Sequence, residues 1–216
     1  MSSSIPPILR ARSLRPWYVM MALVLAVTFG LQDLTTGCVA TTFLREGTVP
    51  DVHAVAEQAR EEDPYQLLLR VHEAAHVRAM ADHAKVTFPL SVGRMLLGGL
   101  LCVVGFMALP GRRGSRALVM QALAVNIAFT ALDYVLSRDM RATWIELFAQ
   151  AGALLPPELP DRERLVSPEF WWGAHRTRLI MVELGMVLMA AALSTTRARQ
   201  WFAMVAAASR DEAEGP

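Results

Sequence analysis

The chain has 216 residues, of which 54% are hydrophobic and 19% are charged, and its formal net charge is +1. Soluble domains usually carry about 25% charged residues. The small net charge provides no basic footprint for nucleic acid, and two cysteines are too few for a disulfide scaffold. Apolar stretches alternate with charged segments, which is the pattern of a membrane protein. All but one of the 21 basic residues are arginine, the exception being Lys85, and this bias favours a GC-rich bacterial genome.

Long apolar stretches predict transmembrane helices. Each has roughly 18 or more mostly apolar residues, enough to cross ~30 Å of hydrocarbon as a helix and too many for a strand. The predicted spans cover residues 17–44, 90–110, 117–137 and 179–196. We therefore predict an all-α integral membrane protein, a four-transmembrane-helix bundle. Its helical extracytoplasmic domain would be built from two outer loops, 45–89 and 138–178.

The basic residues at the ends of these spans predict the orientation. Unopposed arginines precede the first span, lie in the tight turn 111–116 and follow the fourth span: Arg10, Arg12, Arg15, Arg112, Arg113, Arg116, Arg197 and Arg199. By contrast, loop 45–89 has five basic and eight acidic residues, and loop 138–178 has six of each. Because arginine is retained on the cytoplasmic side, residues 1–16, the turn and the tail 197–216 are predicted to be cytoplasmic. The membrane would be the bacterial inner membrane.

A cleaved signal peptide is the alternative for the first span. Thr36-Gly37-Cys38 has some likeness to a lipoprotein cleavage site. However, Thr35 stands where such sites usually have leucine, and the apolar run is longer than a signal-peptide core of about 7–15 residues. We expect the segment to be retained as a transmembrane helix.

The first outer loop is predicted to be helical. Asp63 followed by Pro64 is typical of a helix start, with an N-cap and a proline at the first helical position. Helix-forming residues continue to about Ala84, and a shorter helix is expected over about 51–61.

The second outer loop is expected to contain an amphipathic helix around Trp144 and Phe148, followed by a break at the proline-rich residues 154–160. Ser167-Pro168 predicts another helix start, leading into the fourth span. The last eight residues, SRDEAEGP, are predicted to be disordered.

The sharpest chemical signal is the sequence His72-Glu73-Ala74-Ala75-His76 within the first outer loop. Four residues make slightly more than one helical turn, so His72 and His76 share a face and can bind one zinc ion. Glu73 would then polarise a metal-bound water as the catalytic base. No third ligand follows at a familiar spacing, and His83 lies too far along the helix.

The third ligand would have to come from His53, Glu57, Glu169 or His175. Two other interpretations remain open for the histidines: ordinary hydrogen-bonded residues of a polar, alanine-rich helix, or a non-catalytic metal site. All five histidines fall on the predicted outer side, so this side could also sense pH.

Each predicted span carries one ionisable residue in its outer third: Asp33, Arg94, Asp133 and Glu183. Charges in the bilayer usually face the bundle interior and pair, so we predict an intramembrane polar cluster in which Arg94 pairs with one of the three acids. Snorkelling of Arg94 and Glu183 to the headgroups is the alternative.

Two functions remain. The first is a non-enzymatic integral membrane subunit whose outer domain and polar membrane face bind a protein partner or another copy of the chain. Gly98, Gly99 and Gly105 would permit close helix approach. The second is a membrane-anchored, zinc-dependent hydrolase acting outside the cytoplasm through Glu73. Zinc is the candidate cofactor, the lipid bilayer is a partner in either case, and nucleic acid is not.

Overall fold

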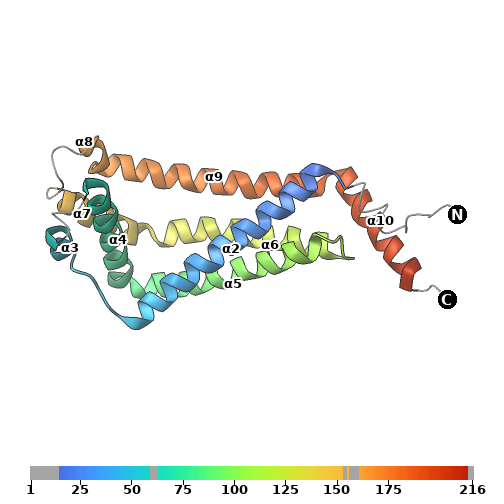
Figure 1. The fold of residues 1–216 in the computed structure, drawn as a ribbon, viewed down its shortest axis with the longest axis horizontal. Helices are drawn as coiled ribbons and strands as arrows, with labels where there is room; N and C mark the ends of the chain where they lie inside the picture. The colour runs from blue at the N-terminus through green and yellow to red at the C-terminus, as the bar shows by residue number, and fades with distance from the viewer. Residues whose placement is uncertain (1–14, 59–62, 153–154, 156–160, 214–216) are drawn as a thin grey trace. The chain divides into compact units, whose positions relative to one another are not determined.

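A computed structural model describes residues 15–58, 63–152, 155 and 161–213, and within these ranges it contains helices and no strand (Figure 1). As predicted, four helices within these described ranges are long and apolar enough to cross a membrane: α2 (Trp17–Glu46), α5 (Ala84–Ala108), α6 (Ser115–Leu136) and α9 (Pro168–Ser194). The shorter helices are α3 (Val52–Gln58), α4 (Pro64–Asp82), α7 (Arg138–Ala151), α8 (Arg162–Leu165) and α10 (Thr196–Ala213). The predictions for Arg10 and Arg12, and for most of the proline-rich break, concern positions outside the described residues.

The chain divides into two compact units. Unit 1 comprises the residues up to Gly37, Gly93–Thr130 and the residues from Val182 onward, and unit 2 comprises Cys38–Val92 and Ala131–Met181. Unit 1 therefore contains parts of the long helices together with α10. Unit 2 contains α3, α4, α7 and α8 with the adjoining ends of the long helices.

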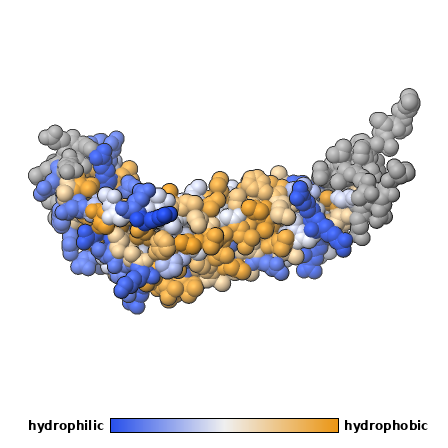
Figure 2. Space-filling model, turned by 90° about the horizontal axis from the view of Figure 1, so that it is seen from below, coloured by the Kyte–Doolittle hydropathy of each residue, from blue (hydrophilic) through white to orange (hydrophobic). Residues whose placement is uncertain are grey.

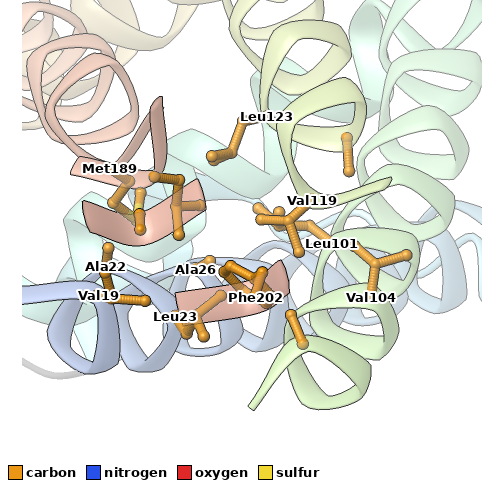
Figure 3. Packing of buried hydrophobic residues seen from close by; sticks show 14 of the residues in the cluster. Val19, Ala22, Leu23, Ala26, Leu101, Val104, Val119, Leu123, Met189 and Phe202 are labelled. Carbon is orange, nitrogen blue, oxygen red and sulfur yellow. The ribbon is translucent and has the colours of Figure 1, made fainter. Parts of the chain in front are cut away.

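The core of unit 1 is assembled from all of its helices. Figure 3 shows Leu23 of α2, Leu101 of α5, Leu123 of α6, Met189 of α9 and Phe202 of α10 gathered in one buried cluster. Of these helices, α2, α5, α6 and α9 also expose large apolar side chains over much of their surface (Figure 2). A helix that is apolar on both its packed and its exposed faces is typical of a membrane span.

Glycine backbones bring α2 and α5 into direct contact. A Cβ atom at Gly98 would lie 2.6 Å from the backbone nitrogen of Leu34, and one at Gly30 would lie 2.5 Å from the backbone nitrogen of Cys102. A Cβ atom at Gly105 would lie 2.8 Å from Val27 Cγ2. The close approach predicted for the second span therefore occurs at Gly98 and Gly105, against a helix of the same chain.

The tail of the chain was predicted to be disordered from residue 209 onward, and this prediction is wrong for residues 209–213, which belong to α10. Trp201, Phe202 and Val205 of this helix are buried in the core of unit 1. Val205 follows Trp201 by four positions and Phe202 by three, so all three lie on one face of a helix. That pattern outweighs the polar composition of the tail.

Unit 2 follows the predicted helix starts closely. The Asp63 side chain accepts a hydrogen bond from the Tyr65 backbone nitrogen at 2.9 Å, and Pro64 is at the first helical position of α4. Likewise α9 begins at Pro168, with Ser167 Oγ accepting from the Phe170 backbone nitrogen. The buried core of unit 2 joins α3, α4 and α7 with Trp171 and Trp172 packed against it.

The start of α5 differs from the prediction, because the helix begins at Ala84 rather than near Leu90. Only His83 separates it from α4, and the Thr87 hydroxyl donates to the carbonyls of Met80 and His83 across this junction. The Met80 carbonyl is one that the end of α4 leaves without a backbone partner, whereas the His83 carbonyl also accepts from the backbone nitrogens of Val86 and Thr87.

Candidate functional site

The ring of His72 is enclosed by aromatic side chains of unit 2. Its centroid lies 4.9 Å from that of Trp144 and 5.8 Å from that of Phe148, both edge-on, and 5.2 Å from that of Trp171. Trp144 is only 2% exposed, and its Nε1 donates to the His72 carbonyl at 3.2 Å. The sequence His72-Glu73-Ala74-Ala75-His76 therefore directs its first imidazole into the core between α4, α7 and the start of α9.

Burial in this aromatic enclosure lowers the pKa of His72, and the negative charge of Glu73 opposes the shift. The neutral imidazole is thus favoured in the folded protein, because apolar surroundings penalise its charged form. Glu73 itself is exposed on the outer face of α4.

His76 and His175 also approach Trp144, with ring centroids 6.1 and 4.9 Å from the indole. The Nε2 atom of His175 is buried and has no hydrogen-bond partner among the described residues. Of the candidate third ligands, His175 is therefore the one that the structure brings to the same aromatic ring as His72 and His76.

The other candidate ligands have their own surroundings. His53 and Glu57 are exposed on α3, and Glu169 accepts a hydrogen bond from Ser167 Oγ at 2.7 Å. His83 Nε2 shares a hydrogen bond of 2.9 Å with Thr143 Oγ1. Across the described ranges, no group of three or more His, Cys, Asp or Glu side chains has an arrangement that could hold a metal ion.

Arg141 is a buried cation that was not among the site residues predicted from the sequence. It is 6% exposed, and its guanidinium lies 4.0 Å from the centroid of the Tyr134 ring. It donates to Ser137 Oγ at 2.6 Å and to the Tyr134 carbonyl. Burial lowers the pKa of Arg141, whereas Tyr134 and Asp133 raise it. Asp133, Ser137 and Arg141 are spaced four residues apart, and this helical spacing is the signal in the sequence that could have identified the group.

The ionisable residues of the predicted intramembrane cluster have distinct surroundings. The Cβ atom of Asp33 lies 2.7 Å from the position that a Gly98 Cβ would occupy, at the crossing of α2 and α5. Arg94 precedes Gly98 by one helical turn, so both lie on one side of α5. The Oε1 atom of Glu183 is buried and has no hydrogen-bond partner among the described residues. Asp133 contributes its negative charge to the surroundings of Arg141.

Pairing of Arg94 with an acid of this set stays a prediction. We expect Arg94→Leu to lower the free energy of unfolding by about 2 kcal/mol, because it would leave the paired carboxylate without its cation in a membrane-spanning segment. Adding Asp33→Asn, Asp133→Asn or Glu183→Gln to Arg94→Leu should restore stability for the true partner. Denaturation of the detergent-solubilised variants measures this. If no double variant is more stable than Arg94→Leu, the pairing prediction is wrong.

The depressed pKa of His72 predicts a pH dependence of stability. The unfolded state binds a proton below about pH 6.5, whereas the folded state resists protonation, so stability should be full above this pH and fall as the pH decreases. One such proton contributes at most about 1.4 kcal/mol per pH unit. Unfolding of metal-free protein between pH 8 and pH 5 measures the slope.

The control for this titration is His72→Phe, which keeps an aromatic ring in the enclosure and removes the titrating group. Its stability should depend less steeply on pH than that of the wild type. His76, His175, Arg141 and Glu73 remain in both proteins, so the difference between the two slopes reports the loss of His72 and of its charge interactions with these neighbours. Equal slopes would show that His72 is not responsible.

The site thus combines three imidazoles around one indole, a buried guanidinium and an exposed carboxylate. These groups belong to His72, His76, His175, Arg141 and Glu73. Comparison with protein-family models, curated proteins and solved structures finds no match to this chain.

Proposed function

We propose that the chain is a non-enzymatic integral membrane subunit that binds a protein partner, either another polypeptide or a second copy of itself. The partner would bind the outer face of α4 and the polar face formed by the ionisable residues of the spans. The membrane would be the bacterial inner membrane, with both termini in the cytoplasm and the loops 45–89 and 138–178 outside. The arginine asymmetry of the sequence supports this orientation.

The observation that carries the proposal is the contrast between the two faces of α4. The inner face, including Leu67, Val71 and Ala75, is fully buried. On the outer face Tyr65 is 55% exposed and Leu69 is 66% exposed. They are one helical turn apart, so they form an apolar stripe next to the exposed Glu73. Large apolar side chains grouped on the surface of a non-spanning helix are typical of an interaction site with a polar rim.

Photocross-linking in intact cells tests the proposal. With p-benzoylphenylalanine at Leu69, we expect one discrete adduct of higher mass, and an adduct of twice the chain mass would identify a second copy. The same probe at Asp139, an exposed residue of α7, is the control and should give little adduct. A Leu69 probe that yields only the uncross-linked chain would contradict the proposal.

The zinc-dependent hydrolase is the second and less supported candidate. His72, His76 and His175 all approach Trp144, but among the described residues their side chains do not form a group that could hold a metal ion. In that case purified protein should contain stoichiometric zinc, and His72→Ala and His76→Ala should each release it. Glu73→Gln should retain the metal and abolish hydrolysis, because Glu73 is the base and not a ligand. Zinc that persists after both histidines are replaced would rule out this motif as the metal site.

A further inference from the structure

One end of unit 1 brings together several segments that are distant in the sequence. The hydroxyls of Tyr18, at the start of α2, and Thr195, at the end of α9, share a hydrogen bond of 3.1 Å. In the turn between α5 and α6, Gly111 has a φ of 79°, and a Cβ there would lie 3.0 Å from side-chain atoms of both Trp201 and Val205. The turn therefore packs directly against α10.

This end of unit 1 is strongly basic. It carries five arginines: Arg112, Arg113, Arg116, Arg197 and Arg199. All except the half-buried Arg116 are exposed. Among the residues whose side chains the structure describes, which at this end of the chain run to Ser209, no carboxylate is paired with any of these five guanidinium groups. They form what we call the arginine collar.

Two members of the arginine collar are held in place by the end of α9. Arg116 Nε donates to the Leu193 carbonyl at 2.8 Å, and Arg199 Nε donates to the Ser194 carbonyl at 3.1 Å. The two guanidinium groups are close enough to interact electrostatically. Each guanidinium has five N–H donors, so most of its donors stay available after one bond to a carbonyl. Two cations fixed side by side without a carboxylate form a site suited to an anion.

The arginine collar also lies where the apolar helices end. The helix α5 ends at Ala108, α6 begins at Ser115, and α9 ends at Ser194. Trp17 is 76% exposed at the first position of α2, and Tyr18 follows it. Tryptophan and tyrosine are enriched at the headgroup level of a membrane. The collar is therefore at the depth of the lipid phosphates of one leaflet.

We propose that the arginine collar binds the phosphate groups of anionic phospholipids. Among the side chains that the structure describes, none compensates the charge of the collar. Its guanidinium groups can bind phosphate in a bidentate manner, and the ends of the spans place it next to the headgroups. The proposal requires the membrane helices but does not depend on a protein partner or on a metal.

Native mass spectrometry of the full chain tests the proposal. Detergent-solubilised protein would be incubated with equal amounts of phosphatidylglycerol and phosphatidylcholine, and we expect the bound lipid to be enriched in phosphatidylglycerol. The variant R112Q/R113Q/R197Q leaves the α9-contacting arginines intact. It should lower this enrichment by about fivefold for each arginine removed. Equal binding of the two lipids by the wild type would overturn the proposal.

The matched control is R138Q/R176Q/R178Q, which removes three exposed arginines of unit 2 and should retain the enrichment. Equal loss in the control would show a general charge effect and contradict a site at the collar. Inorganic phosphate is the second probe: if it displaces phosphatidylglycerol at millimolar concentration, the site binds free phosphate rather than lipid. Unfolding in phosphatidylcholine micelles should be the same for the wild type and R112Q/R113Q/R197Q, which shows that a lost preference is not misfolding.

Discussion

Gly98→Ala is expected to lower the free energy of unfolding by about 3 kcal/mol, because its methyl group has no room at the crossing of α2 and α5. The added Cβ would lie 2.6 Å from the Leu34 backbone nitrogen and 2.8 Å from the Gly30 carbonyl oxygen. Backbone atoms cannot rotate away as a side chain does, so the two helices must separate. Separation of the helices would also break the close contact between the backbones of Gly30 and Cys102.

The neighbouring glycine provides a matched control. A Cβ at Gly99 would meet only Leu34 Cδ1, at 3.5 Å, which is an ordinary van der Waals contact. Gly99→Ala should therefore leave stability unchanged or raise it slightly, because alanine favours a helix more than glycine does. Denaturation of both variants in detergent, with helix content as the readout, distinguishes them. Equal effects of the two substitutions would show that α2 and α5 do not pack at Gly98.

The long helices of the fold were predictable because a run of apolar residues is a local property of the sequence. The start of α4 was predictable for a similar reason, since Asp63 and Pro64 act on the first turn of their own helix. The helix α10 was missed because its polar residues were given more weight than the spacing of Trp201, Phe202 and Val205. Its docking depends on partners far along the chain, such as Gly111.

The candidate site was predictable only in part. The spacing of His72 and His76 fixed their common helix, but their surroundings come from Trp144 and Trp171, which are distant in sequence. Arg141 was overlooked because a lone arginine in a polar loop is usually exposed, and its burial depends on the Tyr134 ring. Local patterns thus identified the residues, whereas tertiary packing decided which of them are enclosed.

Trp144→Ala is expected to have the largest effect in unit 2, lowering the free energy of unfolding by about 3–5 kcal/mol. The indole contacts the rings of His72, Phe148, Trp171 and His175, so its removal leaves a cavity lined by all four. The hydrogen bond from Trp144 Nε1 to the His72 carbonyl is lost as well. Hydrogen–deuterium exchange should therefore accelerate in α4 and α7.

Two further variants separate packing from other effects of losing a tryptophan. Trp144→Phe keeps an aromatic ring but loses the indole N–H, so its exchange in α4 should be intermediate between that of the wild type and that of Trp144→Ala. Trp17→Ala removes a tryptophan that is 76% exposed in unit 1 and should leave exchange in α4 unchanged. If Trp144→Ala also left α4 protected, the aromatic enclosure would not be what holds His72 in the core. The lowered pKa of His72 would then also be unexplained, because the structure attributes it to burial in this enclosure.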